Sequence, residues 1–191
     1  IDSVGCANQA LIQLANGFLT WVDYRGIYLW DGSGKPIYTS QPIEPIFAID
    51  GDLDKSRLIY GTSSYFHNRN MVYWFLSSKT YGEQKLAVKM DLRLTLPSVQ
   101  STLVGRVIPA VYVEDTTTIP VYAAKTYLPD SSPNEIMISG DASGFIYRAY
   151  QQFSDAGAGI DFQYLTPFLD MGSPNIDKRF HKVILWVGAL G

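Results

Sequence analysis

Short runs of hydrophobic residues, bounded by Gly, Asn, Asp and Ser, recur along most of the sequence. Their length and their content of Val, Ile, Tyr and Trp are typical of β-strands. The run at 71–76 is continuously apolar, which indicates a central strand covered on both faces. No window repeats its hydrophobic residues every 3.6 positions, so we expect any helix to be short. The predicted strands cover residues 9–14, 18–22, 27–30, 35–38, 58–67, 71–77, 86–91, one or two within 108–122, 135–139 and 145–151.

The segments between these runs predict turns and linkers. The Asn16-Gly17 pair indicates a two-residue turn between the first two strands. Residues 41–49 contain two prolines and are predicted to be an extended linker, and residues 77–84 a polar loop. Residues 92–103 are expected to be irregular.

Three tight turns share one residue pattern. They are Asp23-Tyr24-Arg25-Gly26, His67-Asn68-Arg69-Asn70 and Asp141-Ala142-Ser143-Gly144. The last position must adopt positive φ, which Gly and Asn tolerate best. The interval from Gly26 to Asn70 is 44 residues and that from Asn70 to Gly144 is 74, so we expect an insertion in the second. Antiparallel units of about 40 to 50 residues are typical of β-propeller blades.

The sequence changes character after Phe153. Residues 160–165 alternate between apolar and polar, and residues 179–187 predict a long final strand. We therefore predict an all-β fold, with antiparallel hairpin repeats at 1–153 forming part of a β-propeller and a C-terminal pair of β-strands within 154–191. About three hairpin units fall short of the roughly four blades that close a propeller, so we expect a longer parent chain.

The composition is that of an ordered domain. Of 191 residues, 47% are hydrophobic, 14% aromatic and 17% charged, and the net charge is −3 with a pI near 5.3. Without a basic cluster, direct nucleic-acid recognition is not expected. Cys6 is the only cysteine, which excludes an internal disulfide and a cysteine-based metal site. No apolar run approaches the ~18 residues of a membrane span, so none is predicted.

Two loops resemble binding motifs but lack essential residues. Gly32-Ser33-Gly34-Lys35 is like the end of a phosphate-binding loop, yet Pro36 replaces the required Ser or Thr. The alternating carboxylates of Asp50, Asp52 and Asp54 suggest a calcium loop. However, Lys55 stands at its sixth position and Gly61 at its twelfth, where Gly and Glu are needed. We expect no bound cofactor or metal ion at either loop.

The residues that could carry catalysis are scattered at turns. Asp23, Asp31, Asp91 and Asp141 lie where Asp commonly bonds the backbone. The only histidines, His67 and His181, are expected to be structural. Residues 139–144 also nearly match the Ser-x-Asp-x-Gly turn of sialidase-type propellers, which is a folding device. We therefore predict no catalytic residues and no enzymatic activity.

Exposed turn tips are the candidate interaction residues. They are Asp23, Tyr24, Arg25, Asp141 and Ser143. The Tyr24 ring could stack on a sugar or pack against a partner protein, and the sequence does not separate these options.

Two segments resemble tailed-bacteriophage structural proteins. The first resembles one propeller blade of these proteins. It consists of Gly5-Cys6-Ala7 followed by residues 18–21, 25–32 and Lys35-Pro36-Ile37. Residues 164–174 and 178–182 resemble the segment that follows the blades. The resemblance implies a virion protein of the tail or neck, similar to nozzle, tubular or stabilisation proteins, with no catalytic residues.

From this resemblance we expect an assembly scaffold that contacts other virion subunits and forms a homo-oligomeric ring. Its location would be the virion tail or neck, with the host cytoplasm as the site of assembly. Two alternatives stay open. One is a carbohydrate-binding or glycoside-cleaving propeller for host recognition, which would need two inward carboxylates in a cavity. The other is a cellular propeller that serves as a protein-interaction module.

Overall fold

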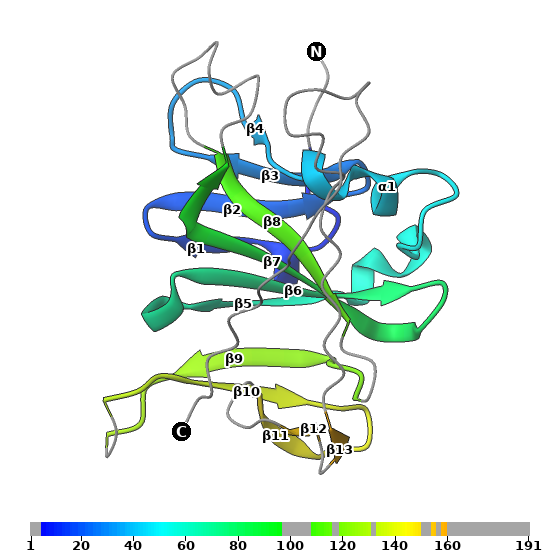
Figure 1. Ribbon diagram of the computed structural model, residues 1–191, viewed down its shortest axis with the longest axis vertical. Helices are drawn as coiled ribbons and strands as arrows, with labels where there is room; N and C mark the ends of the chain where they lie inside the picture. Colours follow the sequence, from blue (N-terminus) through cyan, green and yellow to red (C-terminus); the bar gives the residue numbers. More distant parts are fainter. Residues whose placement is uncertain are drawn as a thin grey trace, which may run out of the picture. The chain divides into compact units, whose positions relative to one another are not determined.

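The computed structural model describes residues 5–96, 108–115, 119–130, 133–149, 154–155 and 158–159. These residues form mostly antiparallel β-sheet with a few short helices, so the all-β prediction is confirmed (Figure 1). The strands are β1 (Gln13–Ala15), β2 (Phe18–Asp23), β3 (Gly26–Trp30), β4 (Ile37–Tyr38), β5 (Thr62–Phe66), β6 (Met71–Ser78), β7 (Gly82–Leu96), β8 (Ile108–Asp115), β9 (Ala123–Tyr127), β10 (Ile136–Gly140), β11 (Ile146–Ala149), β12 (Ser154–Asp155) and β13 (Ala158–Gly159). The helices are the 3-10 turns η1 (Gln9–Leu11), η2 (Gln41–Ile43), η3 (Lys55–Tyr60) and η4 (His67–Arg69), and the α-helix α1 (Glu44–Phe47).

The first sheet is an antiparallel meander in the order β1-β2-β3-β4. Asn16 and Gly17 turn β1 into β2 with φ of 49° and 80°, as the sequence predicts. Tyr24 and Arg25 turn β2 into β3, and Gly26 follows with φ of 153°. A Cβ on Gly26 would collide with the Tyr38 ring and the Ser40 hydroxyl, so this position needs glycine for space as well as for its backbone angle.

The second sheet is a meander in the order β5-β6-β7-β8. Asn70 makes the turn before β6 in the left-handed conformation, with φ of 52°. Central strand β6 is buried on both faces, as its apolar run predicts. Trp74 and Leu76 belong to one core cluster, whereas Tyr73 and Phe75 belong to another.

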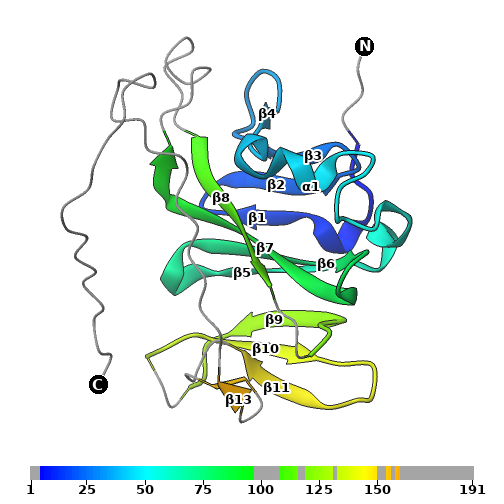
Figure 2. The same cartoon turned by 45° about the vertical axis from the view of Figure 1, so that its right-hand side comes forward.

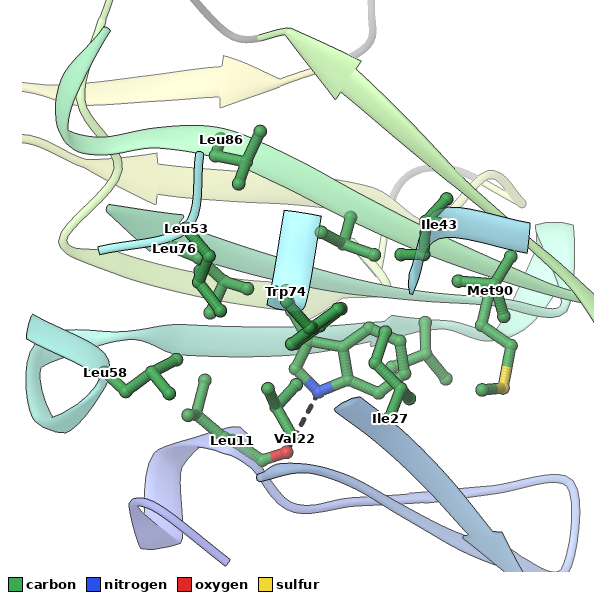
Figure 3. Close-up of a cluster of buried hydrophobic side chains, with 14 of the residues drawn as sticks. Leu11, Val22, Ile27, Ile43, Leu53, Leu58, Trp74, Leu76, Leu86 and Met90 are labelled. Atoms are coloured by element: carbon green, nitrogen blue, oxygen red, sulfur yellow. Dashed lines mark hydrogen bonds between the residues drawn. The ribbon is translucent and has the colours of Figure 1, made fainter. Parts of the chain in front are cut away.

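The larger core cluster lies between the first two sheets. Val22 and Ile27 of the first sheet pack with Trp74 and Met90 of the second (Figure 3). The indole Nε1 of Trp74 donates a hydrogen bond to the carbonyl of Leu11, with an N···O distance of 2.9 Å. Burial of each large apolar side chain stabilises the fold by about 1.5 to 3 kcal/mol, so this cluster holds the two sheets together.

The third sheet has the order β11-β10-β9 and packs on the other face of the second sheet. Met137 of β10 is fully buried in the second cluster with Phe66, Tyr73 and Phe75. The sheet of β5–β8 thus lies between the other two in both views (Figures 1 and 2). Two short strands, β12 and β13, pair with each other.

The first strands of the three sheets are neighbours: β1 contacts β5, and β5 contacts β9. Gln13 of β1 donates to Ser63 of β5, and Thr126 of β9 donates to the Tyr65 carbonyl of β5. The described residues form neither a closed barrel nor a closed propeller.

The hairpins used to define the repeat are not equivalent. Asn70 joins the first and second strands of its sheet, whereas Gly26 and Gly144 join the second and third. The first strands begin at Gln13, Thr62 and Ala123, about 50 and about 60 residues apart. The unequal intervals in the sequence therefore arise partly from comparing different turns.

Several predicted segments were wrong. Residues 41–47 are helical instead of extended, because Pro42 and Pro45 lie in the first turns of η2 and α1, where Pro is tolerated. Residues 9–11 and 58–60, predicted as parts of strands, are 3-10 helix. Strands β6 and β7 extend into the predicted loop at 77–84 and shorten it. Strand β7 also continues to Leu96, into the segment that was predicted to be irregular. Strand β9 was not predicted.

The chain separates into units at 1–159 and 160–191. The predicted strands at 160–165 and 179–187, His181 and the C-terminal segments of the phage resemblance lie outside the described residues. The predicted boundary at 153/154 therefore stays a prediction.

Candidate functional site

A groove of about 720 Å³ opens along the first strands of the three sheets. Its walls come from η1 and β1, from β5 and from β9. The described lining residues are Asn8, Gln9, Ala10, Ile12, Gln13, Leu14, Thr62, Ser63, Ser64, Tyr65, His67, Ala124, Lys125 and Thr126. Hydroxyl and amide side chains predominate in this lining, so the groove suits a polar ligand.

A hydrogen-bond network fixes one wall of the groove. The Ser63 hydroxyl donates to the carbonyl of Ala10, and the Gln13 amide nitrogen donates to the Ser63 hydroxyl at 3.0 Å. The same amide nitrogen lies 3.2 Å from the Ser63 carbonyl. These bonds join β1 to β5 and hold the Gln13 side chain in place.

Ser64 is the unusual residue of the lining. Its side chain is 2% exposed, and its Oγ has no hydrogen-bond partner among the described residues. Buried hydroxyls are normally hydrogen-bonded, and an unsatisfied one costs about 1 to 3 kcal/mol. Ser64 therefore has an unmet hydrogen-bonding capacity beside the groove.

His67 is oriented by a buried carboxylate. Its Nδ1 lies 2.8 Å from Oε1 of Glu135, a residue that is only 7% exposed. The backbone N–H of Asn68 donates to the other carboxylate oxygen at 3.0 Å. The carboxylate thus joins η4 to the residue just before β10, and it accepts from the Nδ1–H of the ring.

Tyr65 lies against the His67 ring, with their centroids 4.3 Å apart. Its hydroxyl donates to Oδ1 of Asn70 at 2.7 Å. Burial, and then the negative charge of Glu135, raise the pKa of Tyr65, so the phenol stays neutral at physiological pH. The Tyr65 ring is the aromatic surface of the described lining.

The ionisable groups of the described lining, apart from the Tyr65 phenol, are His67 and Lys125. No described Asp or Glu lines the groove, so a pair of inward carboxylates for glycoside cleavage is absent from this lining. In the described part of the chain, no three His, Cys, Asp or Glu side chains gather as a metal site would require. No helix among the described residues is long and apolar enough to cross a membrane.

The predicted interaction residues near Asp23 form a self-contained turn. The buried Asp23 carboxylate accepts the Tyr24 N–H at 2.7 Å, and its other oxygen lies 3.6 Å from Nε of Arg25. The Tyr24 side chain is 45% exposed. Asp23 thus stabilises the turn through Tyr24 and Arg25, and the Tyr24 ring is exposed at its tip.

Asp141 has the same structural role in the third sheet. Its Oδ1 accepts the N–H groups of Ser143 and Phe145, each at 2.9 Å, and its Oδ2 accepts the Tyr147 hydroxyl at 3.1 Å. Ser143 is exposed. This turn belongs to the third sheet and the Asp23 turn to the first, so the two do not share a site.

The rejected calcium loop also has a structural explanation. Asp52 accepts from the Ser78 hydroxyl and the Thr80 N–H, and Asp54 caps η3 by accepting from Ser56. Burial opposes ionisation of Asp52, but the hydrogen bonds from Ser78 and Thr80 outweigh it and lower its pKa. These carboxylates hold two loops in place.

Sequence reasoning did not identify the groove. One signal was present: Thr62-Ser63-Ser64 is a run of small polar residues at the start of a strand, and all three are buried. Buried small hydroxyls normally have partners, but those of Ser63 are Ala10 and Gln13, which lie about 50 residues away in the sequence.

Searches with family models, against curated proteins and against solved structures find no match to this chain.

Proposed function

We propose that this chain is a structural, non-enzymatic component of a tailed-bacteriophage virion, in the tail or neck, where it acts as an assembly scaffold. The proposal combines the sequence resemblance with the stacked antiparallel meanders. In it, the three sheets are consecutive blades of an incomplete β-propeller, and the partners are further virion subunits arranged in a ring.

The observation that carries the proposal is the outer face of the third sheet. Met137 faces the core, so its neighbour Ile138 lies on the opposite face with its cross-strand partners Lys125 and Arg148. Ile146 of β11 and Tyr127 of β9 lie on this same outer face and are 77% and 46% exposed.

Apolar side chains on a sheet face favour burial against another β-sheet. Phe145 and Leu128, next to β11 and β9, are also exposed, at 64% and 60%. In the proposed ring, a neighbouring β-sheet covers this face. The turn tips of Tyr24 and Ser143 would provide peripheral contacts.

Mass photometry of the full 191-residue chain, together with mass spectrometry of phage particles produced by the genome that encodes it, tests this proposal. We expect a closed oligomer and a virion-associated chain. A strictly monomeric chain that is absent from particles would contradict it.

A second candidate function is carbohydrate binding, which the polar groove favours. Glycoside cleavage receives no such support, because the described lining contains no carboxylate. A glycan array and a hydrolysis assay test the two activities separately.

A further inference from the structure

We infer that copies of this chain associate head to tail, with the outer face of the third sheet of one copy against the outer face of the first sheet of the next. This inference rests on the proposed function, because it names the sheet that covers the third sheet in the ring. It assigns two different surfaces of the chain to one interface, with a second copy of the same chain as the partner.

The outer face of the first sheet carries a row of aromatic rings. Val22 and Ile27 belong to the core between the first two sheets. Because side chains alternate along a strand, Trp21 and Tyr28 lie on the opposite face, and Tyr38 is the cross-strand partner of Tyr28. The ring centroids lie 5.9 Å apart in the pair Trp21–Tyr28 and 5.6 Å apart in the pair Tyr28–Tyr38. Tyr38, at the end of this row, is partly exposed.

A second row of the same face is more open to solvent. Leu14 pairs with Leu19 across the strands, and Leu19 pairs with Trp30. Leu19 lies two residues before Trp21 and therefore on the same face. Leu14 is 71% exposed, and Leu19 and Trp30 are partly exposed. None of the described strand residues on this face is Lys or Arg, so its strands present an apolar and aromatic surface.

The outer face of the third sheet has a complementary character. Ile138 and Ile146 lie on it beside Lys125 and Arg148, and both cations are exposed. Within the described ranges, neither cation belongs to an ion pair. Lys and Arg are attracted to the faces of Trp and Tyr rings, and the isoleucines favour burial against apolar side chains. The aromatic face of the first sheet meets both requirements.

The difference in charge favours contact between unlike faces. Two third-sheet faces packed together would bring Lys125 and Arg148 of one copy towards the same cations of the other, and like charges repel. On the first sheet, Arg25 lies in the turn after β2, where the Asp23 carboxylate lies 3.6 Å from its Nε and offsets its charge. A head-to-tail contact joins different surfaces, so it repeats from copy to copy and forms a ring where the rotation closes.

The packing within the chain provides the model for this contact. The first sheet packs on the second through one hydrophobic cluster, and the second packs on the third through another. The first and third sheets are therefore the two ends of this stack, and each has one face outside both clusters. A second copy continues the same face-to-face packing of sheets beyond the third sheet.

Sedimentation velocity with two variants of the full chain tests the inference. Leu14→Lys places a charge on the first-sheet face, and Ile146→Lys places one on the third-sheet face. Both side chains are largely exposed, so both variants should fold. Each variant alone should be monomeric at concentrations where the wild-type chain assembles. Mixed in equal amounts, the two should form a 1:1 dimer, because each supplies the intact face that the other lacks.

Ile49→Lys, at an exposed residue outside the sheets, is the matched control and should assemble like the wild-type chain. Circular dichroism verifies that each variant is folded. A folded Leu14→Lys variant that assembles like the wild-type chain would overturn the inference, as would a mixture of the two face variants that stays monomeric.

Arg148→Gln tests the contact between cation and ring separately, because it keeps every apolar side chain of the interface. It should weaken association roughly threefold to tenfold. Unchanged association of this variant would contradict the pairing of the third-sheet cations with the aromatic face.

The outcomes separate this inference from the proposed function. A virion-associated oligomer whose two face variants fail to complement each other would contradict the inference and leave the scaffold proposal standing. A chain that associates head to tail but is absent from phage particles would do the reverse. A wild-type chain that is monomeric at every concentration would contradict the inference directly.

Discussion

The imidazole of His67 and the carboxylate of Glu135 meet at 2.8 Å, although 68 residues separate them in the sequence. This contact joins η4, which follows β5 of the second sheet, to the residue that precedes β10 of the third. Because the carboxylate also accepts the Asn68 N–H, it serves both the packing of the two sheets and the orientation of a groove residue.

Replacing Glu135 with Gln should destabilise the protein by about 1 to 3 kcal/mol, because a charge-assisted pair and a buried acceptor are both weakened. Urea denaturation measures the change. Glu44→Gln is the matched control at an exposed position and should change stability by less than about 0.5 kcal/mol. Equal stabilities of the two variants would show that the His67–Glu135 contact contributes nothing.

Trp74→Phe should destabilise the chain by roughly 2 to 4 kcal/mol. The change leaves a cavity in the larger core cluster and deprives the Leu11 carbonyl of its donor. Trp30→Phe removes an exposed bond to Gly34 and serves as the matched control, with an expected effect below about 1 kcal/mol. Urea denaturation tests the prediction: the unfolding midpoint of Trp74→Phe should lie at a lower urea concentration than that of Trp30→Phe.

Gly26→Ala should be more destabilising than Gly32→Ala. Both glycines have positive φ, but only at Gly26 would an added Cβ collide with Tyr38 and Ser40. We expect about 1 kcal/mol for Gly32→Ala and at least about 3 kcal/mol for Gly26→Ala. Thermal melting of both variants distinguishes backbone strain from steric collision; similar melting temperatures would contradict the close approach.

Asp52→Asn should lower the free energy of unfolding at neutral pH. The difference from the wild-type protein should shrink as the pH falls below about 4. The pKa of Asp52 is lowered in the folded state, so its contribution is fully present above the unfolded-state value and is lost as the pH falls through the folded value. Denaturation of both proteins between pH 7 and pH 3 measures this. A deficit that does not depend on pH would mean that the carboxylate charge is unimportant.

In the proposed ring, Ile146→Lys should weaken self-association without destabilising the protomer, since this side chain is 77% exposed on the outer face of the third sheet. Ile49→Lys, at a residue that is 93% exposed and outside the sheets, is the matched control. Sedimentation velocity should show smaller assemblies only for the Ile146 variant. Unchanged assembly in both would place the subunit contacts elsewhere.

Local chemistry made much of the fold predictable. The Asn16-Gly17 turn, the left-handed Asn70 and the buried β6 each follow from the properties of a few adjacent residues. The helical turns at Pro42 and Pro45 were missed because proline is compatible with a linker as well as with a helix start. The phage assignment depends on resemblance, and it remains a proposal.

The amino-acid sequence alone determined the all-β class and the places where the chain reverses, because strand preference and turn geometry are local properties. Only the tertiary structure decided that Ala123–Tyr127 is a strand, since that segment has no strong strand pattern and is held by its register with β10. The groove arose in the same way. Its walls come from three sheets, and only packing between them brings β1, β5 and β9 side by side.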